Sequence, residues 1–255
     1  MRRLGVCLAA LFIATVPASA EHLIIALSTS DIRIDSDFTG NAITVFGVIE
    51  RDAATVSRAS TCDIAVVVRG PSEPVVARRK EPLLFLWMNR ASMTFASAPT
   101  FYSVSSTRPL DEMATSTALH RFGIGFDSIE LRTLESGDAE TAAEFRKAFI
   151  RLRKEDGLYS EFAGGVDFIG TSESVFRSAA WIPSNAPDGR YIVEVYLFSG
   201  SVFLAKEQVV LNVTKVGFEH FMFEASHNNA LVYGLACVLL ALFTGWLACV
   251  VFRRD

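Results

Sequence analysis

Hydrophobic residues are concentrated at the two ends of the chain and alternate with polar residues between them. Residues 1–20 hold two arginines, an uncharged apolar run over 4–16, and the sequence Pro17-Ala18-Ser19-Ala20. A positive start, a short apolar run and an Ala-x-Ala ending are the parts of a secretory signal peptide. We therefore expect residues 1–20 to be an export signal; an uncleaved anchor and a buried first element are the alternatives.

The other apolar end is long enough to cross a membrane. Residues 230–252 carry no charge, and at ~1.5 Å per residue they span ~34 Å, against a hydrocarbon core of ~30 Å. Arg253 and Arg254 follow at once, which favours a cytoplasmic position for residues 253–255. The pattern predicts one transmembrane helix that acts as an anchor. Ala241 and Gly245 also leave open that this helix packs against a partner helix.

The region between the ends has the pattern of β-strands. Short β-branched or alternating runs, separated by Gly, Pro, Asn and Asp, occupy residues 22–27, 32–34, 42–49, 63–69, 83–88, 93–102, 174–182, 192–198 and 202–213. Such spacing predicts an antiparallel sandwich. Pro187, Gly189 and Tyr191 precede a strand, a Ser199-Gly200 link and a final strand, as in the last two strands of immunoglobulin-like sandwiches. There the tyrosine hydroxyl bonds to nearby backbone.

Helical periodicity interrupts the β pattern. Residues 110–121 contain helix formers with acids at their start. Over 138–156, apolar residues recur at steps of three and four, at Ala142, Phe145, Phe149 and Leu152. This predicts an amphipathic helix packed within the molecule, although a partner-binding helix has the same pattern.

The predicted fold class is therefore mainly β with a helical insert, plus one C-terminal transmembrane helix. We expect an Ig-like β-sandwich over residues 21–215 with the insert at about 109–160; two small domains are the alternative. Residues 216–229 form an amphipathic juxtamembrane segment, which lies on the lipid surface or extends the transmembrane helix. The apolar run 83–88 is either core or an exposed docking strand.

Charge narrows the class of partner. The chain has 24 basic and 28 acidic residues. Removing residues 1–20 (two basic) and 253–255 (two basic, one acidic) leaves 20 basic and 27 acidic residues, or about −7. That balance argues against nucleic acid or anionic lipid as a partner of the body.

Candidate chemical groups are few. Cys7 lies in the signal, and Cys237 and Cys249 lie in the span. Cys62 therefore has no disulfide partner within the body of the protein. We expect Cys62 to be a small buried residue, with an intermolecular disulfide or a reactive thiol as alternatives. The four histidines lack metal-site spacing, and Gly123-Ile124-Gly125 lacks the third glycine of a nucleotide loop. The sequence thus indicates no catalytic, cofactor-binding or metal-binding residue and favours a protein that is not an enzyme.

Several segments together resemble one family, the transmembrane protein family of Alphaproteobacteria. They are Arg69-Gly70-Pro71, Trp87-Met88-Asn89, Phe101 to Ser106, Gly157-Leu158-Tyr159, Pro187 to Tyr191, Tyr233-Gly234, Gly245-Trp246 and Phe252-Arg253-Arg254. The resemblance covers nearly the whole mature chain. It implies a protein of the bacterial inner membrane with a periplasmic body and a cytoplasmic C-terminus, and it implies no activity.

The expected function is a single-pass membrane protein with a non-enzymatic binding domain whose partner is another envelope or membrane protein. The alternative is a small-molecule or ion-binding accessory subunit of an envelope transporter, of the sulfite-exporter type. That alternative needs a pocket between sandwich and insert into which Arg and Tyr side chains converge. A third hypothesis is an unrecognised hydrolase or redox enzyme, with Cys62 as the first candidate residue for redox chemistry.

Overall fold

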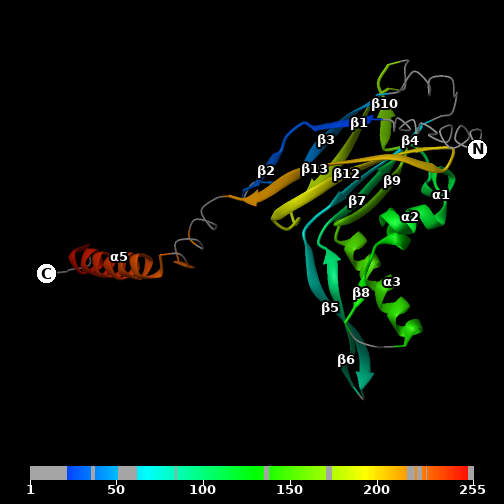
Figure 1. Ribbon diagram of the computed structural model, residues 1–255. Helices are drawn as coiled ribbons and strands as arrows, with labels where there is room; N and C mark the ends of the chain where they lie inside the picture. The colour runs from blue at the N-terminus through cyan, green and yellow to red at the C-terminus, as the bar shows by residue number, and fades with distance from the viewer. Residues whose placement is uncertain are drawn as a thin grey trace, which may run out of the picture.

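The computed structural model describes residues 22–35, 38–50, 62–83, 85–134, 138–170, 174–216, 222, 226–227 and 229–251. The predicted signal at 1–20, the tail at 253–255 and most of the juxtamembrane segment 216–229 lie outside these residues and stay predictions. The described part is mainly β, with several sheets and one C-terminal apolar helix, as expected for the fold class (Figure 1).

The first sheet has four antiparallel strands. In spatial order they are β1 (His22–Leu27), β3 (Gly40–Glu50), β11 (Val175–Pro183) and β10 (Val166–Phe168). Buried and exposed residues alternate along β3 and β11 because one face of this sheet covers the core. Gly47 of β3 lies opposite Phe176 of β11, whose ring occupies the space that a Cβ would need.

The second sheet has six strands. Their order is β2 (Asp31–Ile34), β13 (Val202–Lys215), β12 (Gly189–Ser199), β4 (Cys62–Arg69), β7 (Tyr102–Ser106) and β9 (Tyr159–Ala163). β2 is parallel to β13 and β9 is parallel to β7, while the other pairs are antiparallel. Tyr191 donates its hydroxyl to the carbonyl oxygen of Pro187 at 2.6 Å, so the predicted tyrosine corner is confirmed.

The link between the last two strands is displaced by one residue from its predicted place. β12 continues through Ser199, and the two turn residues are Gly200 and Ser201, with φ of 54° and 69°. Both are left-handed, which suits the twist of a two-residue hairpin.

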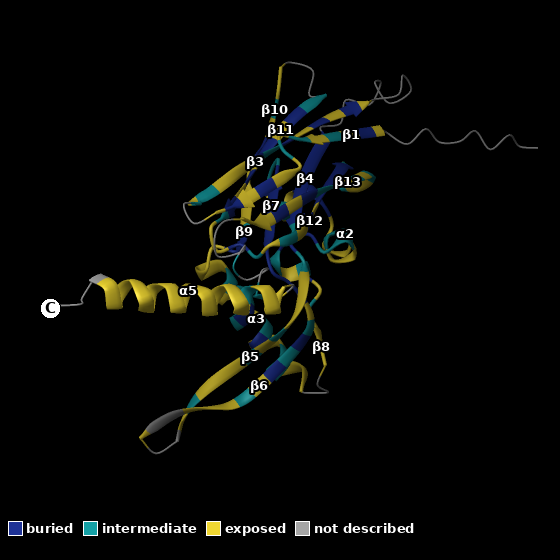
Figure 2. Cartoon of the chain, turned by 90° about the vertical axis from the view of Figure 1, so that its left-hand side faces the viewer, coloured by how far each residue is buried: buried dark blue, intermediate teal, exposed yellow. Residues whose placement is uncertain are grey.

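The six-stranded sheet is covered on both faces. Figure 1 shows β1 and β3 on one side of it and the helices of the insert on the other. Residues 62–68 of β4 are all buried as a result, and Figure 2 shows buried residues concentrated where the layers meet. The buried apolar side chains of sandwich and insert form one continuous cluster.

A third sheet joins the insert to a hairpin that precedes it in the chain. The long hairpin of β5 (Ser72–Leu83) and β6 (Leu86–Pro99) lies before the predicted insert at 109–160 and pairs with β8 (Arg132–Thr133) of the insert. The strand expected over 83–88 is therefore wrong, because that run holds the turn of the hairpin. The sequence between the two strands, Leu84 and Phe85, contains none of the Gly, Pro or Asn by which a turn is recognised in a sequence.

The helices of the insert begin with two short ones. The pattern over 110–121 predicted one stretch, but it divides into α1 (Leu110–Met113) and α2 (Ser116–Phe122). Thr115 separates them and caps α2 by accepting a hydrogen bond from the amide of Ala118. A 3-10 turn, η1 (Phe126–Ser128), follows.

The amphipathic helix α3 (Ala139–Glu155) packs within the molecule, as predicted. Phe145 and Phe149 are buried, and the Phe149 ring lies 5.4 Å from that of Phe95 and 5.9 Å from that of Tyr159. Leu152 was expected on the same buried face but is 51% exposed, because it borders an open groove between α3 and β5.

The C-terminal helix α5 (Ala230–Val251) has 22 residues. It is long and apolar enough to cross a membrane, and its most apolar stretch is not buried against the body. Its start coincides with the predicted span.

Candidate functional site

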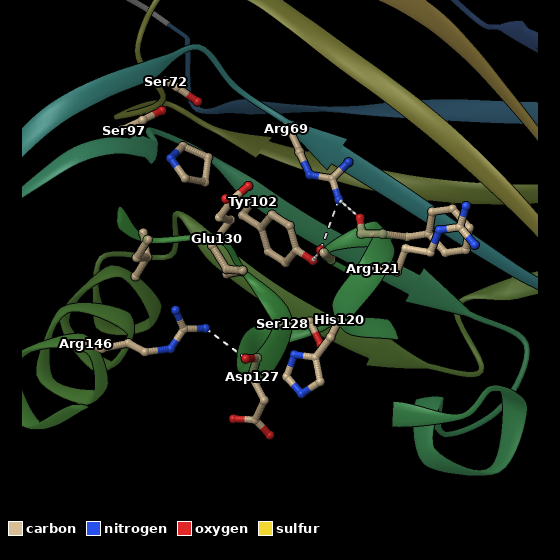
Figure 3. A pocket seen from close by; sticks show the side chains of 15 residues that line it. Arg69, Ser72, Ser97, Tyr102, His120, Arg121, Asp127, Ser128, Glu130 and Arg146 are labelled. Atoms are coloured by element: carbon tan, nitrogen blue, oxygen red, sulfur yellow. Dashed lines mark hydrogen bonds between the residues drawn. The ribbon is translucent and has the colours of Figure 1, made fainter. Parts of the chain in front are cut away.

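A cavity of about 750 Å³ lies between the six-stranded sheet and the insert. Its lining comes from the end of β4 (Arg69), the base of the hairpin (Ser72, Ser97, Pro99), β7 (Tyr102), the end of α2 (His120 to Gly123), the segment Asp127 to Leu131, and α3 (Arg146). Figure 3 shows the labelled side chains around this space. We call it the insert cleft. It meets the requirement stated from the sequence for a pocket where Arg and Tyr side chains converge.

Arg69 forms one wall of the insert cleft and holds the end of α2 to the sheet. Its Nη2 donates to the carbonyl oxygens of Phe122 (2.8 Å) and Gly123 (3.0 Å). Its Nη1 forms an ion pair with Glu194 of β12, and the guanidinium carbon lies 5.7 Å from the Tyr102 ring centre. Arg69 is therefore fixed from several sides.

Glu194 is the counterion behind Arg69. Its side chain is buried on the insert side of β12, and its second oxygen lies 2.5 Å from the Nζ of Lys206 on β13. Two cations thus share one buried carboxylate. Because a buried carboxylate needs such compensation, the insert-facing side of the sheet retains a small excess of positive charge.

Tyr102 anchors the glycine turn after α2. Its hydroxyl donates to the carbonyl oxygen of Gly123 (2.7 Å) and accepts from the amide of Gly125 (2.9 Å). Gly123 and Gly125 have φ of 65° and 89°, where a side chain would be strained. Burial raises the pKa of the Tyr102 phenol far above its usual value. The sequence Gly123-Ile124-Gly125, which lacks the third glycine of a nucleotide loop, forms a turn that the Tyr102 hydroxyl attaches to the sheet.

Arg146 enters the insert cleft from α3 on the side opposite Arg69 (Figure 3). Its Nη2 donates to the carbonyl oxygens of Phe126 (3.1 Å) and Asp127 (2.9 Å). The structure gives its Nε and Nη1 no hydrogen-bond partner among the described residues. Loss of water around the half-buried guanidinium lowers its pKa. These N–H groups are therefore donors to which a ligand in the cleft could bind.

Basic groups outweigh acidic ones around the cavity. Arg69, His120, Arg121 and Arg146 are basic, while Asp127 and Glu130 are acidic. Glu130 is paired with Arg132 at 2.6 Å, and Figure 3 shows the carboxylate of Asp127 directed away from Arg146. A cleft with several N–H and hydroxyl donors and little free negative charge suits a small oxyanion.

Of the candidate chemical groups considered from the sequence, His120 and Gly123 line the insert cleft. Cys62 is buried at the start of β4, as expected. Of the histidines, only His120 lines the insert cleft, and His220 lies outside the described residues. Among the residues that the structure describes, no group of three or more His, Cys, Asp or Glu is placed to hold a metal ion.

Sequence reasoning missed Arg69, Tyr102 and Arg146 as a set. Arg146 is one of several basic residues in the predicted helix over 138–156, and Arg69 and Tyr102 belong to strands distant from it in sequence. No local motif joins them. Only the packing of the insert on the sheet brings them to one cavity.

Comparison with known proteins adds a family. No curated protein matches the chain. A family model described as "Putative transmembrane protein (Alph_Pro_TM)" matches residues 22–254, which include the sandwich, the insert and α5. Together with the one helix that could span a membrane, this match shows that the chain belongs to that family of membrane proteins.

Proposed function

We propose that this protein is a single-span anchor of the bacterial inner membrane whose periplasmic body, an Ig-like sandwich, binds a small oxyanion in the insert cleft without catalysis. The Ig-like assignment is supported by strand order. β1-β3-β11-β10 corresponds to strands A-B-E-D, and β13-β12-β4 corresponds to G-F-C. The tyrosine corner at Tyr191 is a further hallmark.

The orientation is supported by the two ends of the sequence. Residues 1–20 have the composition of an export signal, and Arg253 and Arg254 follow the span directly. Both features favour a body outside the cytoplasm and a short tail inside it.

Arg146 is the observation that carries the oxyanion proposal. A guanidinium that has lost part of its hydration and uses only one nitrogen internally gains from an anion at its remaining N–H groups. Arg69 is on the opposite wall, and the hydroxyls of Ser72, Ser97 and Ser128 border the same cavity. Phosphate, sulfate, sulfite and a carboxylate share the chemistry that such a site recognises.

Replacement of Arg146 tests the proposal. Titration calorimetry at low salt measures anion binding to the full chain in lipid nanodiscs. We expect the unaltered protein to bind at least one of sulfate, sulfite, phosphate and acetate. Arg146→Met should weaken that binding by at least about tenfold, because it removes a charged hydrogen bond to the anion. Arg151→Met is the matched control, because Arg151 is an exposed arginine of the same helix, paired with Glu155. Absence of binding by the unaltered protein, or equal binding by Arg146→Met, would contradict the proposal.

A second candidate function is docking of another envelope protein. The groove between α3 and β5 is lined mostly by apolar and basic residues, with Glu144 and Asp156 as its acidic members, and Val76 and Leu152 on its two sides are each about half exposed. Photocrosslinking from position 152 in intact cells tests this, with position 140 on the same helix as control. One defined membrane protein crosslinked from 152 and not from 140 is expected; the same products from both positions would argue against this groove.

A further inference from the structure

The β5–β6 hairpin ends in an apolar sequence, and the two side chains of this tip that the structure describes, Phe85 and Met88, are exposed. All six residues from Leu83 to Met88 are apolar, and β5 ends at Leu83 while β6 begins at Leu86. Phe85 is 99% exposed and Met88 is 47% exposed. Both views of the chain show the hairpin projecting away from the sandwich (Figures 1 and 2). A large aromatic residue with so little protein contact marks an interaction surface.

Basic residues surround this tip. The exposed members are Arg78, Arg79, Lys80 and Arg90. Glu81 is the one acidic residue between positions 78 and 90, and Arg79 bonds both to it and to Glu144 of α3. No ion pair joins Arg78, Lys80 or Arg90 to any residue in the described ranges. The distal hairpin is therefore locally positive although the body as a whole is acidic.

The hairpin leaves the body at the end from which the chain runs to the membrane. Arg69, the last residue of β4, pairs with Ile192 of β12, and Ile192 pairs with Val210 of β13. β4 and β13 thus run in the same direction. β4 leads into β5 at this end, and β13 continues to Lys215 and then toward α5.

Chain lengths allow the tip and the span to meet one bilayer. β5 has 12 residues, which extend ~40 Å as a strand. Residues 216–229 can reach at most ~50 Å when fully extended. The tether is therefore long enough for the body to stand off the membrane by the length of the hairpin.

We propose that the hairpin tip inserts into the surface of the same membrane that holds α5, with its basic residues on anionic lipid headgroups. Apolar and aromatic side chains enter the boundary between headgroups and acyl chains, where tryptophan is favoured. Insertion stays at this depth because the turn backbone needs water or headgroups for its hydrogen bonds. The tip then fixes the orientation of the body, and the insert cleft with it, relative to the bilayer. This inference is independent of oxyanion binding.

A single-tryptophan variant of the full chain tests the insertion. Trp181→Phe and Trp246→Phe leave Trp87 as the one tryptophan. The protein is reconstituted in vesicles of phosphatidylglycerol and phosphatidylcholine, with bromine on the acyl chains of one sample. We expect brominated lipid to quench Trp87 emission and aqueous iodide to quench it only weakly. In the same background, Phe85→Asp with Met88→Asp should raise the iodide quenching constant by about threefold or more and abolish quenching by brominated lipid.

Two controls separate insertion from misfolding and from general charge effects. Val202→Asp with Phe203→Asp introduces the same two charges at exposed apolar residues where β12 and β13 are joined, the opposite end of the sheet from the hairpin, and it should leave Trp87 quenching unchanged. Arg78→Gln, Lys80→Gln and Arg90→Gln should each weaken insertion into phosphatidylglycerol vesicles by up to about fivefold and have little effect in pure phosphatidylcholine.

Two results would overturn the inference. One is a Trp87 emission that iodide quenches equally in the parent and in the Phe85→Asp, Met88→Asp variant. The other is protection of Trp87 only when native membrane proteins are present, which would assign the tip to a protein partner.

Discussion

The two faces of strand β12 bury side chains of different kinds. Toward the four-stranded sheet it presents Tyr191, Val193, Val195 and Leu197, all fully buried. Toward the insert it presents Glu194, Tyr196 and Phe198, and Glu194 is buried with its two cations. One strand therefore belongs to an apolar core on one side and to a mixed polar interface on the other.

The difference shows where a binding site can form in such a fold. Two sheets packed face to face meet through apolar side chains, which interdigitate and leave little room. The insert shares buried apolar residues with the sheet, but beside the cleft it is attached by hydrogen bonds from Arg69 and Tyr102 of the sheet to the carbonyl oxygens of Phe122 and Gly123. Bonds of this kind hold helices at a distance from the sheet, so a cavity with unused donors remains. We expect the first face to determine stability and the second to determine binding.

The largest effect should come from the apolar face. Leu197→Ala removes a fully buried side chain and should lower the free energy of unfolding by about 3 kcal/mol, through lost burial and the cavity left behind. Ile192→Ala, on the same strand but 39% exposed, should cost less than half of that. Urea unfolding of the full chain in detergent micelles measures both. Equal losses would mean that the two faces do not differ as described.

The next effect should separate stability from binding on the polar face. Glu194→Ala leaves Arg69 and Lys206 without their shared carboxylate and should cost about 2 kcal/mol of stability. This loss of stability is smaller than for breaking a fully buried ion pair, because both Arg69 and Lys206 remain partly accessible to water. Sulfate affinity should rise severalfold, since Arg69 loses its internal counterion. Glu155→Ala, an exposed carboxylate of α3, is the control. A fall in affinity would show that Glu194 positions Arg69 for the ligand.

The sandwich and the span were largely predictable from the sequence, for identifiable reasons. Strands such as β4 and β12 are long β-branched runs between turn residues, and the corner at Tyr191 has a local signature. Residues 230–252 are recognisable by length and lack of charge alone. The hairpin turn between β5 and β6 was not predictable, because an apolar turn resembles a buried strand.

The insert cleft could not be predicted because its parts are joined only by tertiary packing. Arg69 and Arg146 are widely separated in sequence, and each looks like an ordinary charged residue at the edge of a strand or on a helix. β9 also pairs in parallel with β7 across the whole insert, and such a pairing depends on the path of α3. The sequence supplied the requirement for a pocket but no residue by which to locate it.

A smaller effect should distinguish the two buried phenols at neutral pH. Tyr102→Phe leaves the carbonyl of Gly123 and the amide of Gly125 without their partner and should cost about 1–2 kcal/mol. Tyr191→Phe removes a single bond to the carbonyl of Pro187 and should cost about 1 kcal/mol or less. Only the first should weaken oxyanion binding, because only Tyr102 holds the turn that borders the cleft. Weakened binding in Tyr191→Phe would indicate a global rather than a local effect.

The smallest difference between the faces should appear in alkaline solution. Burial raises the pKa of Tyr102, on the insert side, and of Tyr191, on the core side, far above the usual value near 10. A phenol with a raised folded-state pKa contributes stability that is complete below pH 10 and is lost as the pH rises, because the unfolded chain releases the proton first. Each such tyrosine lowers the folding equilibrium constant by up to tenfold per pH unit above that point. Tyr102→Phe and Tyr191→Phe should therefore reduce the slope of the unfolding free energy against pH between pH 10 and 11 by similar amounts. This should hold although the two substitutions lower the unfolding free energy by different amounts at neutral pH. Unequal changes in slope would contradict this expectation and would mean that water reaches one of the two phenols in the folded protein.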